Sequence, residues 1–245
     1  MQLIKPLYRE NYAGEDVTTN LVYQGGQRIP TKEYMPSQIV NLQISNQALV
    51  IGNGPTRLDF DLTLLKNHRA GLMGSRRLQT YGCNALFRDV ETDFLVATGE
   101  EIVAEIAASG HCDDHIVYAN AESIVQYPRK FYLIPQDPHW NSGAIAAYMA
   151  CFDGHKKVFL LGFDGNDMSR GNSNVYSNTP GYYTADSNIP EAFWEKSMLE
   201  VFNTYPTVDF VRVAPTPKYR MPESWLYQTN LRSVTFRDFV VEADF

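Results

Sequence analysis

The chain has 245 residues, of which 44% are hydrophobic, and a formal net charge of -7 at pH 7. This composition excludes a globally disordered chain, and the negative charge, with Lys and Arg scattered in short groups, excludes broad electrostatic attraction to nucleic acid. The three cysteines lack the spacing of a zinc site or a disulfide framework, and no apolar run reaches the roughly 18 residues of a membrane-spanning helix, so we expect a cytoplasmic protein without a transmembrane segment.

Residues 1–46 are polar and rich in turn-forming residues. Gly25 and Gly26 separate two short segments with strand-forming side chains, which predicts a hairpin, and Pro30 and Pro36 interrupt the chain that follows. We therefore predict an N-terminal appendage over residues 1–46, followed by one α/β nucleotide-binding domain over residues 47–245.

From residue 48 onward, short apolar runs alternate with stretches of helical spacing. Continuous apolar runs of this length are typical of strands buried on both faces of a parallel sheet. The predicted strands cover residues 48–51, 94–97, 115–118, 158–161 and 208–213. The predicted helices lie near residues 58–67, 100–109, 143–152 and 191–203. This alternation predicts a single Rossmann-like, doubly wound, mostly parallel sheet.

One stretch, residues 165–190, is too long for an ordinary connection. It is rich in Asn, Ser, Gly and Tyr, and Gly165 and Gly171 would let it move. We interpret it as a lid or binding loop.

A tight glycine turn follows the first predicted strand. It consists of Gly52, Asn53, Gly54 and Pro55 and precedes a predicted helix, so the backbone can approach a phosphate or a ribose closely. Neither standard nucleotide fingerprint is satisfied, because Arg57 stands where the dinucleotide pattern has Gly and no Gly-Lys-Ser/Thr follows. A plain strand-turn-helix junction is the alternative interpretation.

A second polar turn opens a helix of small residues. Asn141, Ser142 and Gly143 begin this helix, and Asp164 follows the next apolar strand at the end where open α/β sheets place ligand-binding groups. The alternative is purely structural: Asn141 and Ser142 cap the helix and Asp164 caps a loop.

Together these turns resemble a known family. The Gly-Asn-Gly-Pro turn, the later Gly82-Cys83-Asn84, the Asn-Ser-Gly helix opening and the strand ending Leu-Gly-Phe-Asp164 are similar to the bacterial sialyltransferases that use CMP-sialic acid. The same motifs, especially the Gly-Asn-Gly-Pro turn and the strand ending in Asp164, are also similar to those of the 6-hydroxymethylpterin pyrophosphokinase-like family. The resemblance covers roughly residues 48 to 203.

The resemblance implies a donor-binding site made of turn residues. In the sialyltransferases the asparagine of the glycine turn contacts the nucleotide donor, which implies this role for Asn53, and the asparagine after the second strand corresponds to Asn84. Thr98 takes a position where the family usually has Asn, and Asn141 replaces the family's Thr. The implied donor-binding set is Gly52, Asn53, Gly54, Pro55, Asn84, Thr98, Asn141, Ser142, Gly143 and Asp164.

The chain departs from the family in the lid. The family uses a lid histidine as general base, but no histidine follows His155, so Asp186 is the candidate base. The first lid tyrosine corresponds to Asn166, and the candidate phosphate contacts are Tyr176, Tyr182 and Tyr183.

Three arginines and one short polar run also have simpler interpretations. Arg57, Arg76 and Arg77 either pair with a substrate phosphate or face solvent. We predict no metal site in the run 111–115, because alternating residues at a strand entrance point to opposite faces.

The sequence therefore predicts a glycosyltransferase-like protein that transfers a sugar from a CMP-linked donor to a sugar or other hydroxyl acceptor, without a resident cofactor or metal. One alternative is a pterin-type pyrophosphokinase that uses ATP and Mg²⁺ near Asp164 and Asp167. The other is a non-catalytic nucleotide-binding protein. The donor sugar, the acceptor and the oligomeric state stay open. The leading hypothesis requires the turns of Asn53, Asn84 and Asn141 to converge.

Overall fold

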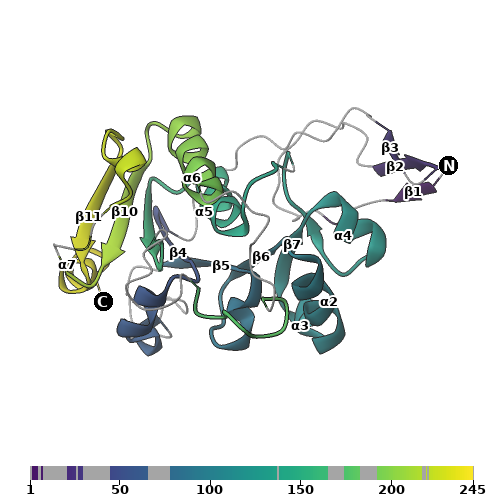
Figure 1. The fold of residues 1–245 in the computed structure, drawn as a ribbon, viewed down its shortest axis with the longest axis horizontal. Coiled ribbons are helices and arrows are strands. Elements are labelled where there is room, and N and C mark those ends of the chain that lie inside the picture. Colours follow the sequence, from purple (N-terminus) through teal and green to yellow (C-terminus); the bar gives the residue numbers. More distant parts are fainter. Residues whose placement is uncertain are drawn as a thin grey trace.

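The computed structural model describes residues 2–4, 7, 21–25, 27–29, 45–65, 78–136, 138–164, 174–182, 192–216, 219 and 221–244. Its centre is an eight-stranded sheet in the order β11-β10-β9-β4-β5-β6-β7-β8, and all the described pairings in it are parallel (Figure 1). The strands are β4 (Gln47–Ile51), β5 (Gln79–Cys83), β6 (Phe94–Ala97), β7 (Ile116–Ala119), β8 (Tyr132–Leu133), β9 (Lys157–Leu161), β10 (Asp209–Ala214) and β11 (Leu231–Thr235).

Helices cover both faces of this sheet. They are α2 (Glu100–Ser109), α3 (His111–Asp114), α4 (Ala121–Gln126), α5 (Ser142–Phe152), α6 (Phe193–Thr204) and α7 (Phe236–Glu242). Buried residues of α5 and α6 belong to one core cluster and those of α2, α4 and α7 to the other. The structure thus confirms the predicted Rossmann-like, doubly wound sheet.

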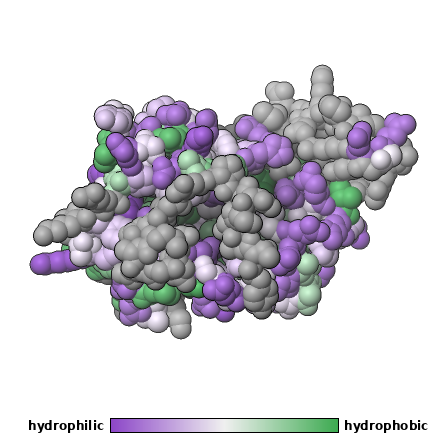
Figure 2. Space-filling model, in the orientation of Figure 1, coloured by the Kyte–Doolittle hydropathy of each residue, from purple (hydrophilic) through white to green (hydrophobic). Residues whose placement is uncertain are grey.

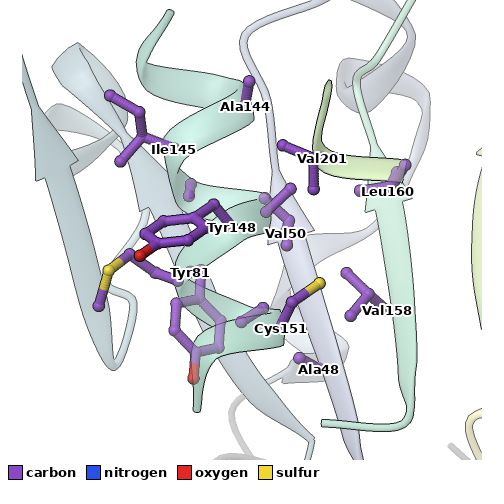
Figure 3. Packing of buried hydrophobic residues seen from close by; sticks show 14 of the residues in the cluster. Ala48, Val50, Tyr81, Ala144, Ile145, Tyr148, Cys151, Val158, Leu160 and Val201 are labelled. Carbon is purple, nitrogen blue, oxygen red and sulfur yellow. The ribbon is translucent and has the colours of Figure 1, made fainter. Parts of the chain in front are cut away.

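Strand β4 shows why an uninterrupted apolar run is needed at the centre of the sheet. Successive strand residues point to opposite faces. Ala48 and Val50 face α5 (Figure 3), whereas Leu49 and Ile51 belong to the core cluster that includes Phe239 of α7. All four β4 side chains are fully buried.

Helix α5 lies close to the sheet because its side chains are small. Its alanines at positions 144, 146, 147 and 150 are fully buried, so little bulk separates the helix from β4, β5 and β6. This packing brings the amino end of α5 to the carboxyl ends of those strands.

A second, smaller sheet forms near the N-terminus. It contains β1 (Gln2–Ile4), β2 (Leu21–Gln24) and β3 (Gln27–Ile29), all antiparallel, and lies at the opposite end of the molecule from β11 (Figure 1). The β2–β3 pairing confirms the hairpin, with Gly25 at a φ of 60°. Leu7 forms a parallel bridge to Tyr132 of the main sheet. The proposed boundary at residue 46 stays a prediction.

Several elements differ from the sequence prediction. The helix predicted over residues 58–67 is replaced, as far as residue 65, by two short 3₁₀ helices, Pro55–Asp59 and Leu62–Leu64. Three strands of the sheet, β5, β8 and β11, were absent from the apolar runs, since β5 carries Gln and Thr, β8 has two residues, and β11 is a half-exposed edge strand.

The prediction that the run 111–115 is a strand entrance is wrong. Residues His111–Asp114 form the short helix α3, and the rings of His111 and His115 stack with centroids 4.1 Å apart. A helical turn brings residues four apart to one side. Within the described ranges, no group of three His, Cys, Asp or Glu side chains is arranged to hold a metal ion.

One face of the molecule can be followed in Figure 2. On the face shown in Figure 2, the coloured residues are mostly hydrophilic, with hydrophobic residues in small separate patches. Among the described helices, none has the length and apolar character required to span a membrane.

Candidate functional site

The predicted turn residues follow neighbouring strands of the sheet. Asn53 follows β4, Asn84 follows β5 and Thr98 follows β6, and these three parallel strands are adjacent, so their carboxyl ends share one edge. Asn53 Nδ2 donates to the carbonyl oxygen of Cys83 at 3.3 Å, and the Thr98 amide donates to Asn84 Oδ1 at 3.2 Å. The structure therefore brings these three turns together.

The glycine turn is held by close backbone contact with the end of β9. The amide of Gly52 donates to the Leu161 carbonyl at 2.8 Å, and that of Gly54 donates to the Gly162 carbonyl at 2.9 Å. A Cβ at position 52 would come within 2.6 Å of the Gly162 oxygen, and a Cβ at position 54 within 2.5 Å of the same oxygen and of Asp164 Oδ2. Both glycines are required by this approach.

Asp164 is engaged with the same turn. Its Oδ2 accepts a hydrogen bond from the Thr56 amide at 2.7 Å, and its Oδ1 accepts from the Thr56 hydroxyl. Pro55 begins the 3₁₀ helix that contains Thr56. Asp164 is buried and ties the end of β9 to the β4 turn, while its predicted role in donor binding stays untested.

Helix α5 contributes the third turn. Asn141 caps it, with Oδ1 accepting from the Ala144 amide at 3.0 Å and Nδ2 donating to the Trp194 carbonyl at 3.4 Å. The Asn141 side chain is therefore occupied within the protein. The next residue, the buried Ser142, hydrogen-bonds the Cys83 thiol, so the start of α5 reaches the turn after β5.

Gly143 lies in the first turn of α5, where little space is left. A Cβ on this residue would lie 3.3 Å from Asn141 Oδ1 and 3.6 Å from Cε1 of Phe163, which precedes Asp164. The residue thus lies between the cap of α5 and the end of β9. All the described turns of the predicted site are linked by direct contacts.

Asn84 has an unusual backbone conformation. Its φ is 47°, in the left-handed region that few residues other than glycine adopt, although asparagine tolerates it better than most. This conformation turns the chain sharply from β5 into the 3₁₀ helix Asn84–Arg88. Residues held in sparsely populated backbone regions cluster at functional sites.

Besides Nε of the charged Arg57, two buried atoms of neutral side chains at this edge have no hydrogen-bond partner among the residues that the structure describes. They are Asn53 Oδ1 and the Tyr182 hydroxyl. Because Asn53 Nδ2 bonds the Cys83 carbonyl, the amide orientation is set and Oδ1 is the atom left to accept. Native proteins pair nearly all such atoms, so each unpaired one calls for a partner such as a ligand.

The Tyr182 hydroxyl oxygen lies beside the Asn84 side chain and the Ala85 amide, whose N–H groups lower its pKa by hydrogen bonding, so it is the hydroxyl proton that lacks an acceptor. Burial raises the pKa of Tyr182 to about 12, with a further contribution from the Cys83 thiol. Burial likewise raises the pKa of the Cys83 thiol to about 11, opposed by the Arg57 charge and the Ser142 hydrogen bond. Both groups therefore stay neutral at physiological pH, and Tyr182 retains a proton to donate.

Residues 174–182 pass over this edge. The Val175 amide donates to the Asn53 carbonyl at 2.8 Å. The Tyr176 hydroxyl donates to Asp89 Oδ2 at 2.6 Å and accepts from the Arg57 guanidinium at 2.7 Å, so it is already engaged with two protein groups. The phosphate contact that the resemblance implies for Tyr176 stays a prediction.

Arg57 does not face solvent, and its pairing with a substrate phosphate stays a prediction. Its side chain is only 1% exposed and pairs with Asp89 at 3.4 Å instead of facing solvent. Asp89, Arg88 and Ala85, which follow β5, also border the site and were missed. Nothing in their local sequence marks them, because their role depends on contact with residues about 90 positions away.

Part of the predicted site lies outside the described residues. Asp186 and Tyr183, proposed as base and phosphate contact, are among them, as are Asn166, Asp167, Arg76 and Arg77. Their roles stay predictions.

No protein-family model matches the chain, and no curated protein matches it. Among solved structures, the chain is similar to the sialyltransferase CstII from Campylobacter jejuni in complex with cytidine-5'-monophosphate, at 14% identity and a TM-score of 0.48, covering 71% of this chain and 82% of that one. The same enzyme in complex with CMP-3FNeuAc matches at 12% identity and a TM-score of 0.44, covering 69% of this chain and 81% of that one. Values this low do not show the family.

Proposed function

We propose that the chain binds the nucleotide of a CMP-linked sugar at the carboxyl edge of β4, β5 and β6 and transfers the sugar to a hydroxyl acceptor. The observation that carries the proposal is a pair of buried groups with free hydrogen-bonding capacity among the described residues: Asn53 Oδ1, which has no donor, and the Tyr182 hydroxyl, whose proton has no acceptor. They lie where the family resemblance puts the donor nucleotide, and a buried polar group without a partner is costly to the folded state.

The chemistry of these two atoms supports a ligand that carries both hydroxyl groups and acceptor oxygens. Asn53 Oδ1 only accepts, so its partner is a hydrogen-bond donor such as a ribose hydroxyl, not a phosphate oxygen. The neutral Tyr182 hydroxyl is suited to donate to a phosphate oxygen. A nucleotide supplies both groups.

In the proposed reaction, the bond between the sugar carbon and the phosphate oxygen of the donor breaks, and the acceptor oxygen forms a new bond to that carbon. Asp186 takes the acceptor proton, and the departing CMP keeps the bonding electron pair. A hydrogen bond from Tyr182 to the phosphate would stabilise the charge that develops there. As the resemblance implies, no metal ion takes part in the proposal.

Thermal unfolding with added nucleotides tests this proposal. A ligand that binds only the folded state at about 100 times its Kd stabilises it by about 2.7 kcal/mol. We expect CMP to raise the melting temperature without magnesium, and UDP, GDP and ATP to have little effect. Stabilisation by ATP with Mg²⁺ alone would instead favour pyrophosphate transfer, and no shift with any nucleotide would contradict a nucleotide site.

Asn53→Ala tests the atom that carries the proposal. Loss of one neutral hydrogen bond is expected to weaken CMP binding about three- to tenfold, measured by calorimetry, with little loss of thermal stability. The wild type is expected to prefer CMP over 2'-deoxy-CMP or 3'-deoxy-CMP, and the variant to lose that preference. Asn203→Ala, on an exposed position of α6, is the matched control. Unchanged affinity in Asn53→Ala would remove this residue from the site.

A further inference from the structure

We infer that Arg57 is a positioning residue which, with Tyr176 and Asp89, fastens residues 174–182 to the strand ends and so sets the Tyr182 hydroxyl beside Asn84. The inference rests on the proposed function, because it explains how the same nucleotide site is held in shape. Neither Arg57 nor Tyr176 needs to contact the ligand for this role.

Arg57 carries a buried positive charge directly after the glycine turn. Its terminal nitrogen donates to the Tyr176 hydroxyl at 2.7 Å and lies 3.4 Å from Asp89 Oδ2, while its Nε has no partner among the described residues. A buried charge is tolerated only when it is paired. The arginine therefore favours the arrangement in which Tyr176 and Asp89 stay in place.

Tyr176 is the point where three parts of the chain meet. Its ring centroid lies 5.2 Å from the guanidinium carbon of Arg57 and 5.6 Å from that of Arg88, distances at which cations attract an aromatic face. Its hydroxyl donates to Asp89 at 2.6 Å. Burial and this hydrogen bond raise the pKa of Tyr176 far above its usual value, so the hydroxyl keeps the proton that the contact needs.

Arg88 provides a second attachment. It forms an ion pair with Glu105 of α2, and it also donates to Thr179 Oγ1 at 2.9 Å and to the Pro180 carbonyl at 2.8 Å. The Val175 amide adds a bond to the turn of Asn53. Residues 174–182 are therefore held at three places: at Val175, at Tyr176, and at Thr179 with Pro180.

The attachments determine where Tyr182 lies. Its ring stacks on that of Tyr176, with centroids 6.0 Å apart and an interplanar angle of 30°. Gly181, directly before Tyr182, has a φ of 79°, which residues with a side chain rarely adopt. A Cβ there would also come within 2.5 Å of Ile102 Cδ1. A displacement of Tyr176 is thus transmitted to the Tyr182 hydroxyl.

A double-mutant cycle on CMP affinity separates positioning from simple packing. Tyr176→Phe removes only the hydroxyl that Arg57 and Asp89 hold, and Tyr182→Phe removes the hydroxyl at the site. If Tyr176 acts through Tyr182, we expect Tyr176→Phe to weaken CMP binding about three- to tenfold in the wild type but less than about twofold in the Tyr182→Phe background. Equal weakening in both backgrounds, or none in the wild type, would overturn the inference.

Hydrogen exchange of the ligand-free protein gives a readout that does not depend on the proposed function. The amides of Val175, Thr179 and Tyr182 are hydrogen-bonded, the latter two within residues 174–182. We expect Tyr176→Phe and Arg57→Lys to accelerate the exchange of these amides. The control Tyr205→Phe lies in the core cluster of α5 and α6, on the opposite face of the sheet from Tyr176, and should leave the exchange unchanged. Unchanged exchange in the first two variants would overturn the inference even if CMP binds. If exchange is accelerated in these two variants but the wild type does not bind CMP, the proposed function is contradicted and the positioning role of Arg57 is not.

Discussion

The two ends of strand β5 treat buried polar groups in opposite ways. Toward its amino end, the Tyr81 hydroxyl donates to Asp153 Oδ2 at 2.6 Å and lies 3.1 Å from His155 Nε2, which is itself 2.9 Å from Gln79 Oε1. All four side chains are at most 1% exposed. Figure 3 shows Tyr81 near the Cys151 end of α5, away from Ala144 at the helix start. These buried polar groups hydrogen-bond one another.

At the carboxyl end the pairing is incomplete. Asn53 Oδ1 and the Tyr182 hydroxyl have no partner among the described residues, and Asn84 adopts a left-handed backbone. An unpaired buried donor or acceptor costs roughly 1–3 kcal/mol, and a strained residue adds a similar amount.

The difference indicates that one end of β5 contributes to stability and the other end to ligand binding. Buried side chains that hydrogen-bond one another stabilise the folded state, whereas unpaired buried atoms lower its stability until a partner binds. Substitutions at the amino end should therefore change stability without changing nucleotide affinity. Substitutions of unpaired atoms at the carboxyl end should do the reverse.

The largest effect is expected for Gly54→Ala, which tests how rigidly the carboxyl end is built. The added Cβ would lie 2.5 Å from the Gly162 oxygen and from Asp164 Oδ2, and the backbone oxygen cannot move freely. Overpacking of this kind is expected to lower the free energy of unfolding by about 3 kcal/mol and to abolish CMP binding. Denaturant unfolding and calorimetry measure both.

Gly99→Ala is the matched control for this substitution. Its Cβ would have its nearest neighbour at 3.8 Å, an ordinary contact, and the residue has a negative φ. Because Gly99 is the N-cap of α2, where alanine is less favourable than glycine, we expect wild-type affinity and a loss of stability clearly smaller than that of Gly54→Ala. A Gly54→Ala protein as stable as Gly99→Ala would show that the turn is not constrained as its contacts indicate.

A smaller effect is expected for Tyr81→Phe. Unlike Asn53→Ala, it should lower stability and leave CMP affinity unchanged. Removing the hydroxyl leaves the buried Asp153 carboxylate and His155 without that contact, which is expected to cost about 2 kcal/mol of unfolding free energy. The CMP affinity of the folded protein should not change. A weakened affinity at constant stability would contradict the division between the two ends.

The fold could be predicted from the sequence where one kind of signal dominates. The apolar runs of β4, β6 and β9 and the pattern of α2 are each within about a residue of the observed element, because burial on both faces demands an uninterrupted apolar strand. β5 was not among these runs because Gln79 and Thr80 are polar yet buried. Their partners, His155 and Asp93, are distant in sequence, so local pattern gives no sign of them.

The candidate site could be predicted only as a set of turns. That the turns of Asn53 and Asn84 are neighbours follows from the strand order. The strand order does not show which of their side-chain atoms already have hydrogen-bond partners within the protein. Asn141 resembles a ligand contact in the sequence, yet its side chain caps α5 and bonds Trp194. Conversely, nothing near Arg57 indicates that it meets Tyr176, which is 119 positions away. Such contacts follow from the folded chain alone.

The smallest expected effect concerns pH and the state of Tyr182 at the carboxyl end. Burial raises the pKa of Tyr182 to about 12, above the value near 10 of an exposed tyrosine, so its hydroxyl stays a donor as the pH rises. The raised pKa means that the folded form binds this proton more tightly. Its contribution to stability is therefore complete below about pH 10 and is lost as the pH rises from there toward 12.

The ratio of the CMP Kd in Tyr182→Phe to that in the wild type isolates this group, because other titrating groups affect both proteins alike. We expect the ratio to stay constant from about pH 7 to about pH 10, since a hydroxyl with a pKa of about 12 is almost fully protonated throughout. A solvated tyrosine would be half ionised at the upper limit, and the ratio would fall toward one. Such a fall would mean that the Tyr182 hydroxyl is hydrated rather than buried, and the contrast between the two ends of β5 would then rest on Asn53 alone.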